Sequence, residues 1–72
     1  MMQFTSVSSS NIAAIGYDSA SRKLVVKFLN GTTYEYSGVP ENVYRALMSA
    51  SSHGKYFDAN IKNGEYSCRQ IG

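Results

Sequence analysis

The Asn30-Gly31 pair is the feature that most constrains how this chain can fold, because it stands between two strand-like runs. The run before it reads LVVKFL, over residues 24–29, and the run after it reads TTYEY, over residues 32–36. Asn-Gly between such segments is the strongest short-range signal for a β-hairpin. The sequence therefore predicts a hairpin over residues 24–36.

Two loop lengths suit this hairpin, and they give the strands opposite faces. A loop of two residues pairs Lys27 with Tyr34 and places Glu35 among aliphatic side chains, whereas a loop of three residues, 29–31, pairs Val26 with Tyr34. The second register gathers the apolar and aromatic side chains on one face: Leu24, Val26, Phe28, Tyr34 and Tyr36. Because a slip of one residue exchanges the two faces, burial should select the three-residue loop, which needs a positive φ at Gly31.

The segments before the hairpin predict further strands. Residues 3–8 alternate loosely and predict a short edge strand. Residues 12–17 read IAAIGY, with apolar side chains on both faces, as in a strand that is covered on each side. Gly16 within this strand indicates a bulge or a close approach of another backbone. The strands between residues 12 and 36 should form an antiparallel meander.

After the hairpin the periodicity becomes helical. Pro40 suits the first turn of a helix. Apolar residues follow at helical spacing, and two larger side chains flank them: Val43, Ala46, Leu47 and Ala50, with Tyr44 and Met48. A second, shorter helix is predicted over residues 54–62, with Ser52 as its cap and with Phe57 and Ile61 facing inward.

The predicted fold class is α+β: an antiparallel meander sheet of three to four strands, covered on one face by two helices. Residues 65–71 leave two alternatives open, a final strand or a tail laid against the core. With 72 residues, the chain is expected to form one domain, 1–72, with a small core.

Composition limits the classes of function. The net charge is +2, and the charges are spread evenly along the chain, with three basic and two acidic residues in 1–36 and four basic and three acidic in 37–72. Such a spread argues against a dedicated polyanion-binding stripe. No apolar run approaches the roughly 18 residues of a membrane span, and no signal peptide is recognisable. The single cysteine, Cys68, fits a reducing compartment, so a soluble, cytoplasmic protein is expected.

The order and spacing of several segments resemble the KTSC domain family. The matching segments are Ser10-Asn11-Ile12, Ile15-Gly16-Tyr17-Asp18, residues 24–28, Tyr34-Glu35-Tyr36, Val39-Pro40, residues 50–57 and Ile61-Lys62. The resemblance covers nearly the whole chain. Such domains occur alone in bacterial or phage proteins and at the C-terminus of some lysyl-tRNA synthetases. The resemblance therefore implies an RNA-binding role, and it brings no established activity to assign to single residues.

Catalytic and metal chemistry find little support in the sequence. A nucleophile needs a base beside it, and the chain offers only His53 and Cys68, which could meet only if the C-terminal segment folded back. The acidic residues are scattered over different elements: Asp18, Glu35, Glu41, Asp58 and Glu65. No group of ligands has the spacing of a metal site. We therefore expect no enzyme, no metal and no cofactor.

Two sets of residues are candidates for binding nucleic acid. Tyr34 and Tyr36 could stack bases if their face of the sheet were open, but the predicted register favours core packing, with the hydroxyls at the rim. The other set lies on the predicted helices and combines three basic residues with one aromatic: Lys55, Lys62, Arg45 and Tyr56. An ordinary solvated helix face is the competing interpretation of that second set.

The sequence thus predicts a non-enzymatic accessory domain that binds RNA weakly through a basic helix face. The alternative is a protein–protein interaction module that uses the sheet edge or the flank formed by Tyr44 and Met48. The two functions differ in salt dependence, because an apolar interface is nearly insensitive to salt.

Overall fold

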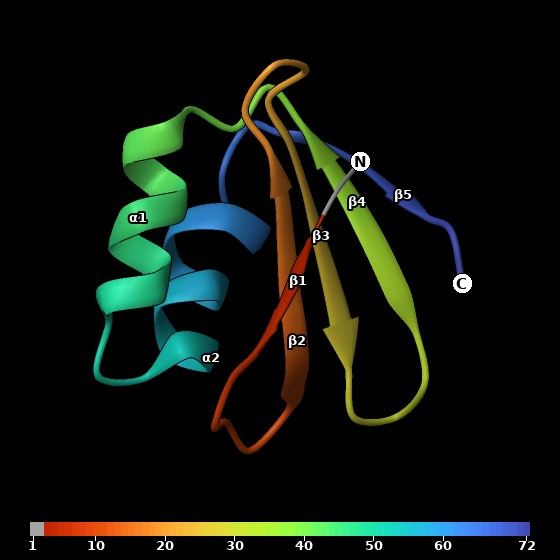
Figure 1. Ribbon diagram of the computed structural model, residues 1–72, viewed down its shortest axis with the longest axis vertical. Coiled ribbons are helices and arrows are strands. Elements are labelled where there is room, and N and C mark those ends of the chain that lie inside the picture. Colours follow the sequence, from red (N-terminus) through yellow and green to blue (C-terminus); the bar gives the residue numbers. More distant parts are fainter. Residues whose placement is uncertain (1–2) are drawn as a thin grey trace.

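The computed structural model describes residues 3–72 and consists of one sheet with helices on a single face (Figure 1). Five antiparallel strands follow one another across the sheet in chain order: β1 (Phe4–Ser6), β2 (Ile12–Asp18), β3 (Lys23–Phe28), β4 (Thr33–Ser37) and β5 (Ser67–Gln70). The helices lie between β4 and β5 in the chain: α1 (Glu41–Ser49), α2 (His53–Phe57) and the π-helical segment η1 (Asp58–Lys62). The predicted α+β class is confirmed.

The sheet has more strands than the three to four that were predicted. Residues 67–70 form β5, which pairs with β4, so the strand alternative for the C-terminal segment is the correct one. Residues 4–6 form β1 as the predicted edge strand and pair with β2. The strand signals were weak because all the side chains of β1 and β5 are exposed, which leaves no apolar alternation to detect.

The hairpin has the register predicted from burial. Val26 lies opposite Tyr34, and the Phe28 amide donates to the Thr32 carbonyl over 2.9 Å, which closes a three-residue loop. Gly31 has a φ of +93°, in the region that favours glycine. The Asn30 side chain completes the turn, because its Oδ1 accepts a hydrogen bond of 3.0 Å from the Thr32 amide.

Strand β2 corrects one detail of the sequence analysis. Its bulge lies at Ala13, because Ile12 pairs with Phe28 while Ala14 pairs with Lys27. The extra residue turns both Ile12 and Ile15 toward the helices, where each is fully buried. The prediction of regular alternation along this strand was therefore wrong at residues 12–14.

The helices follow the predicted apolar spacing with one change of geometry. Helix α1 begins directly after Pro40 and buries Leu47 completely. Helix α2 is capped by Ser52, whose hydroxyl oxygen accepts from the Lys55 amide over 3.4 Å. The predicted continuous helix over residues 54–62 instead widens into a π-helix at residue 58. Phe57 and Ile61 still face inward, with 1% and 0% of their surface exposed.

The core lies between the helices and one face of the sheet. Its fully or nearly buried members come from every layer: Ile12, Ile15, Leu24, Val26, Tyr36, Val39, Leu47, Phe57 and Ile61. Tyr17 fastens α1 to the sheet, since its ring stacks on Tyr44 at 4.6 Å and its hydroxyl donates to the Val39 carbonyl over 2.6 Å. No helix within residues 3–72 has the length and apolar character needed to cross a membrane.

Candidate binding cleft

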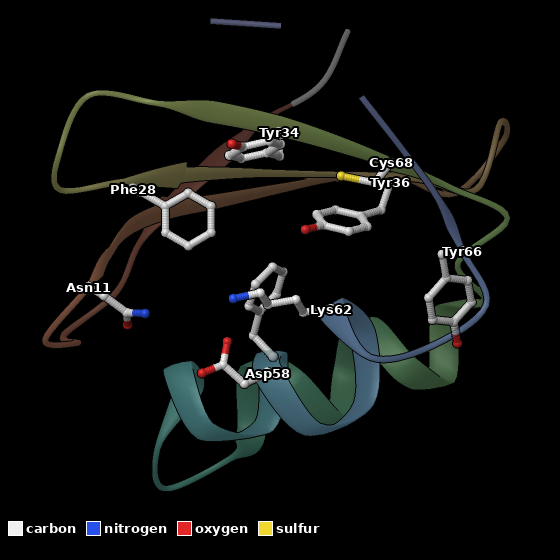
Figure 2. Close-up of a pocket in the computed structure, with 9 residues that line it drawn as sticks. Asn11, Phe28, Tyr34, Tyr36, Asp58, Lys62, Tyr66 and Cys68 are labelled. Carbon is white, nitrogen blue, oxygen red and sulfur yellow. The ribbon is translucent and has the colours of Figure 1, made fainter. Parts of the chain in front are cut away.

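A cavity of about 390 Å³ opens between the sheet and the helical segment α2–η1 (Figure 2). Five aromatic side chains line it: Phe28, Tyr34, Tyr36, Phe57 and Tyr66. Four polar side chains complete the lining: Asn11, Asp58, Lys62 and Cys68. We call this cavity the cleft.

The strand register explains how the sheet side of the cleft is built. Tyr34 and Tyr36 are two residues apart on β4, so both point to the face that the helices cover. Cys68 lies directly opposite Tyr36 on the neighbouring strand β5, and directly opposed residues project from the same face. Phe28 ends β3 beside them. The same pleat that forms the core therefore also forms one wall of the cleft.

The aromatic rings hold one another in edge-to-face contacts. Phe28 meets Tyr34 with ring centroids 5.9 Å apart and Phe57 with centroids 5.5 Å apart. Tyr36 meets Phe57 in the same manner at 5.4 Å. Such contacts are favourable beyond the area they bury, so the aromatic wall is expected to be rigid.

Tyr36 is the most buried polar group of the wall, with 5% of its surface exposed. Burial raises the pKa of its hydroxyl well above the usual range, and the neighbouring Cys68 thiol raises that pKa further. A tyrosine hydroxyl is protonated at neutral pH in any case, and the raised pKa of Tyr36 keeps it a hydrogen-bond donor into the alkaline range. Figure 2 shows it directed into the cleft, as is the Lys62 ammonium group.

The helical side of the cleft supplies both signs of charge. Asp58 and Lys62 begin and end the π-helical segment η1, and both line the cleft. Within residues 3–72 neither side chain forms an ion pair, because the three ion pairs of that region involve other acidic groups. π-Helical turns are frequent at functional sites, because they redirect side chains within a helix.

The structure brings together three of the six residues predicted to bind nucleic acid. Lys62, Tyr34 and Tyr36 share the cleft, although they come from different elements of the chain. The core-packing interpretation of the tyrosines agrees with their burial, which is complete enough at Tyr36 to leave little ring surface free. Tyr34 is only half-buried.

The other three predicted residues do not line the cleft. Lys55 is exposed near the start of α2, and Tyr56 is half-buried against the core. Arg45 is exposed on α1, and its Nη2 lies 2.8 Å from Glu41 Oε2, which offsets its charge. The predicted basic helix face is thus divided between the cleft and the outer surface of the helices.

The only candidate catalytic pair is not assembled. His53 Nδ1 lies 2.9 Å from the Leu47 carbonyl oxygen, so the ring links the end of α1 to α2. Cys68 lines the cleft, and His53 does not. Among residues 3–72 no group of three histidine, cysteine or acidic side chains lies close enough to hold a metal ion.

The sequence analysis missed several residues that line the cleft. Asn11 and Asp58 were given no binding role, and Tyr66 and Cys68 lay in the segment for which a final strand and a tail against the core both stayed open. The Cys68 position depends on the pairing of β4 with β5, and the Asp58 position depends on the π-helical turn. Neither the pairing of β4 with β5 nor the π-helical turn leaves a local pattern in the sequence.

The opposite side of the sheet, which we call the helix-free face, carries the excess of positive charge. It includes Lys23, Val25, Lys27, Glu35 and Arg69. Glu35 Oε1 lies 3.1 Å from Arg69 Nη2 and 3.8 Å from Lys23 Nζ. Residues 38–66 contain three basic and three acidic residues, so the net charge of +2 belongs to the strands and their turns.

A meander sheet with helices on one face and an aromatic cleft defines a small α+β domain. The KTSC domain model matches residues 8–66, and the chain belongs to the KTSC domain family. The crystal structure of a KTSC domain protein from Yersinia pestis agrees with a TM-score of 0.91 and 48% sequence identity, over 100% of both chains. The predicted family is confirmed.

Relatives include both short and long proteins. A protein of Stutzerimonas stutzeri is 35% identical over 65 residues, which cover 90% of this chain and 92% of the relative. A lysine–tRNA ligase of Trichormus variabilis is 38% identical over 55 residues, which cover 76% of this chain and 10% of the ligase. The similarity to the ligase is therefore confined to a segment of the size of this domain.

Proposed function

We propose that this KTSC domain is a non-enzymatic accessory domain that binds RNA weakly through the α2–η1 side of the molecule. The observation that carries the proposal is that Lys62 shares the cleft with Tyr34 and Tyr36. A cationic group beside aromatic rings is the combination with which proteins hold single-stranded nucleic acid. We assign phosphate contacts to Lys62 and Lys55, with Arg45 and Tyr56 at the margin of the surface.

The lysine–tRNA ligase relatives support an RNA-related setting, because their name places them with transfer RNA as a substrate. A cytoplasmic location, and action of residues 1–72 as one domain, are part of the same proposal. In a ligase the similar segment belongs to a much longer chain, where a high effective concentration can compensate for weak intrinsic binding.

The number of available cations sets the expected strength. Contacts from Lys55 and Lys62, with Arg45 as a third, give a salt slope of about −1.4 to −2 on a single strand. Free-standing binding should then be weak, with a dissociation constant of about 10⁻⁴ to 10⁻⁶ M.

Fluorescence anisotropy with single-stranded RNA and transfer RNA, measured across a salt series, tests this proposal. We expect a slope of about −2 in log K against log salt, and the loss of roughly one unit in Lys55→Ala, as for one phosphate contact. The absence of binding at low salt, or binding that neither salt nor the substitution changes, would contradict RNA binding.

A protein–protein interaction role is the second candidate, and one observation favours it. Strand β5 lies at the end of the sheet, and all four of its residues are exposed. Such an edge can accept an extended segment of another protein by strand addition. The Tyr44 and Met48 flank is less suitable, since both residues pack against the core. Binding of this kind would be nearly independent of salt.

A further inference from the structure

We infer that the cleft receives one unstacked nucleobase that carries an exocyclic amino group, with the adjoining phosphate at Lys62. This inference rests on the proposed function for its biological ligand, which is RNA, and it adds the part of the RNA that enters the cleft. It follows from the shape, the hydrogen-bonding groups and the charges of the cleft, taken in turn.

The shape of the cleft suits one planar ring system. Its volume of about 390 Å³ is at the lower end of the range for small-molecule sites. Phe28 and Tyr34 form an aromatic wall on the sheet side, and Tyr34 is half-buried, so part of its ring is available to a ligand. Aromatic side chains stack on any base, because every base has a π-face.

The hydrogen-bonding groups of the cleft distinguish between bases. The Asp58 carboxylate accepts hydrogen bonds, which suits the amino group of adenine, cytosine or guanine. Uracil instead has a single ring N–H that lies between two carbonyl oxygens. The Asp58 carboxylate would repel those two oxygens. Asn11 adds donors, because its Oδ1 already accepts from the Ser9 hydroxyl over 3.0 Å and its amide nitrogen points toward the cleft (Figure 2).

The charges of the cleft indicate where the phosphate of the nucleotide would bind. Lys62 lies four residues after Asp58 on the same π-helical segment and forms no ion pair within residues 3–72. Its ammonium group is therefore available to a phosphate, and its charge reduces the repulsion between that phosphate and Asp58. Asp58 and Lys62 together match a nucleotide, whose base edge donates and whose phosphate is anionic.

Nucleoside 5′-monophosphates test the inference without RNA. The isotope-labelled domain is titrated with AMP, CMP, GMP and UMP, and with ribose 5-phosphate and inorganic phosphate as ligands that lack a base, while amide and side-chain resonances are followed by NMR. A single stacked base gives weak binding, with a dissociation constant of about a millimolar or higher. We expect the three amino-bearing nucleotides to bind on the order of tenfold more tightly than UMP, with shifts at Phe28, Tyr34 and Asp58.

The substitution Asp58→Asn supplies the decisive variant, because it replaces an acceptor with a group that both donates and accepts. It should reduce the preference over UMP to about twofold or less, while Glu65→Gln, which makes the same change of charge outside the cleft lining, should leave the preference intact. The inference is overturned by binding of ribose 5-phosphate as tight as that of AMP. Equal binding of UMP, shifts confined to the helix-free face, or an unchanged preference in Asp58→Asn would also overturn it.

The two proposals can fail separately. RNA binding with the expected salt slope, but without base preference in the nucleotide titration, would overturn this inference and leave RNA binding in place. Amino-selective nucleotide binding in a domain that binds no RNA at low salt would support the cleft assignment and contradict the proposed function.

Discussion

The two faces of the sheet are built from the same strands and have opposite chemistry. In β3, Leu24 and Val26 point to the helices and are fully buried. Lys27, the next residue after Val26, points to the helix-free face, and its ammonium group lies 4.1 Å from the centroid of the Phe4 ring. On the covered face, five aromatic and four polar side chains line the cleft. On the helix-free face, Glu35 is shared by Lys23 and Arg69.

The difference shows that the excess of base over acid is not by itself a guide to the binding surface. The net positive charge belongs to the strands and their turns, where Glu35 partly neutralises the cations of the helix-free face. The cleft contains one acidic and one basic side chain, Asp58 and Lys62, so its net charge is zero. Neither side chain forms an ion pair within residues 3–72, and both lie beside aromatic rings. Charged groups without an ion-pair partner that lie beside an aromatic cleft can select a ligand, whereas paired surface charges contribute little.

The largest expected effect concerns the covered face. Leu47→Ala should lower the free energy of unfolding by about 2 to 5 kcal/mol, because Leu47 is fully buried between α1 and the sheet and the truncation leaves a cavity. The same substitution at Leu29, which is 61% exposed in the hairpin loop, should change it by about 0.5 kcal/mol or less. Chemical denaturation measures both, and a Leu47→Ala cost below about 1 kcal/mol would mean that α1 is not packed as described.

The second effect concerns the register that keeps the two faces apart. Gly31→Ala should cost about 1 to 2 kcal/mol through left-handed strain alone, because nothing lies within 4 Å of the position of an added Cβ. Gly31→Asn is the matched variant and should cost less, since asparagine tolerates positive φ. Equal stabilities of wild type and Gly31→Ala in a denaturant melt, or cross-strand NOEs that place Lys27 opposite Tyr34, would refute this role of Gly31.

These two positions also show how much of the fold could be predicted from the sequence. The hairpin was predictable to the residue, because Asn30-Gly31 locates the turn and only the register that pairs Val26 with Tyr34 gathers the apolar and aromatic side chains on one face. The bulge at Ala13 was not, since alanine fits either face and only the pairing with β3 reveals the extra residue. The first helix followed from its apolar spacing, but the π-helical turn at Asp58 has no sequence signal of that kind.

The candidate site was predictable only in part, for a related reason. Lys62 and Tyr34 could be selected as residue types that bind nucleic acid, but their meeting in one cleft depends on long-range packing of η1 against β4. For Cys68 the sequence could not decide between a final strand and a tail against the core, because β5 is too short and too polar to be recognised before its partner strand is known.

A smaller effect is expected from the buried phenol of the covered face at alkaline pH. Burial raises the pKa of the Tyr36 hydroxyl in the folded state, so the folded domain holds this proton more tightly than the unfolded chain. The associated stability is fully present below the unfolded value, about pH 10, and is lost as pH rises from there toward the folded pKa. In melts between about pH 8 and pH 11, the free energy of unfolding of Tyr36→Phe should therefore fall less with rising pH than that of the wild type.

Burial also raises the pKa of Tyr17, so Tyr36→Phe should remove only part of the alkaline effect. The substitution keeps the ring and its contact with Phe57, which makes stability at neutral pH a control for packing. An identical alkaline loss in wild type and Tyr36→Phe would show that the Tyr36 proton is not linked to folding.

The smallest effect is expected on the helix-free face. Glu35→Gln removes the carboxylate that Lys23 and Arg69 share. The Glu35 side chain is 16% exposed, but both cations reach solvent, which screens the pairs and leaves each worth about 0.2 to 1 kcal/mol. The cost should shrink further at about 1 M salt, where screening acts over roughly 3 Å. Denaturant melts at low and high salt measure it, and a cost that salt does not change would mean that Glu35 stabilises the sheet by packing rather than by charge.

The most direct test of the account compares one lysine from each face in the RNA titration. The central claim is that RNA contacts the cleft side, so Lys62→Ala should weaken binding and reduce the salt slope by roughly one unit. Lys27→Ala removes the same charge from the helix-free face and should leave the slope within about 0.2 of wild type. Equal losses in the two variants, or a larger loss in Lys27→Ala, would place the RNA on the helix-free face and contradict the account.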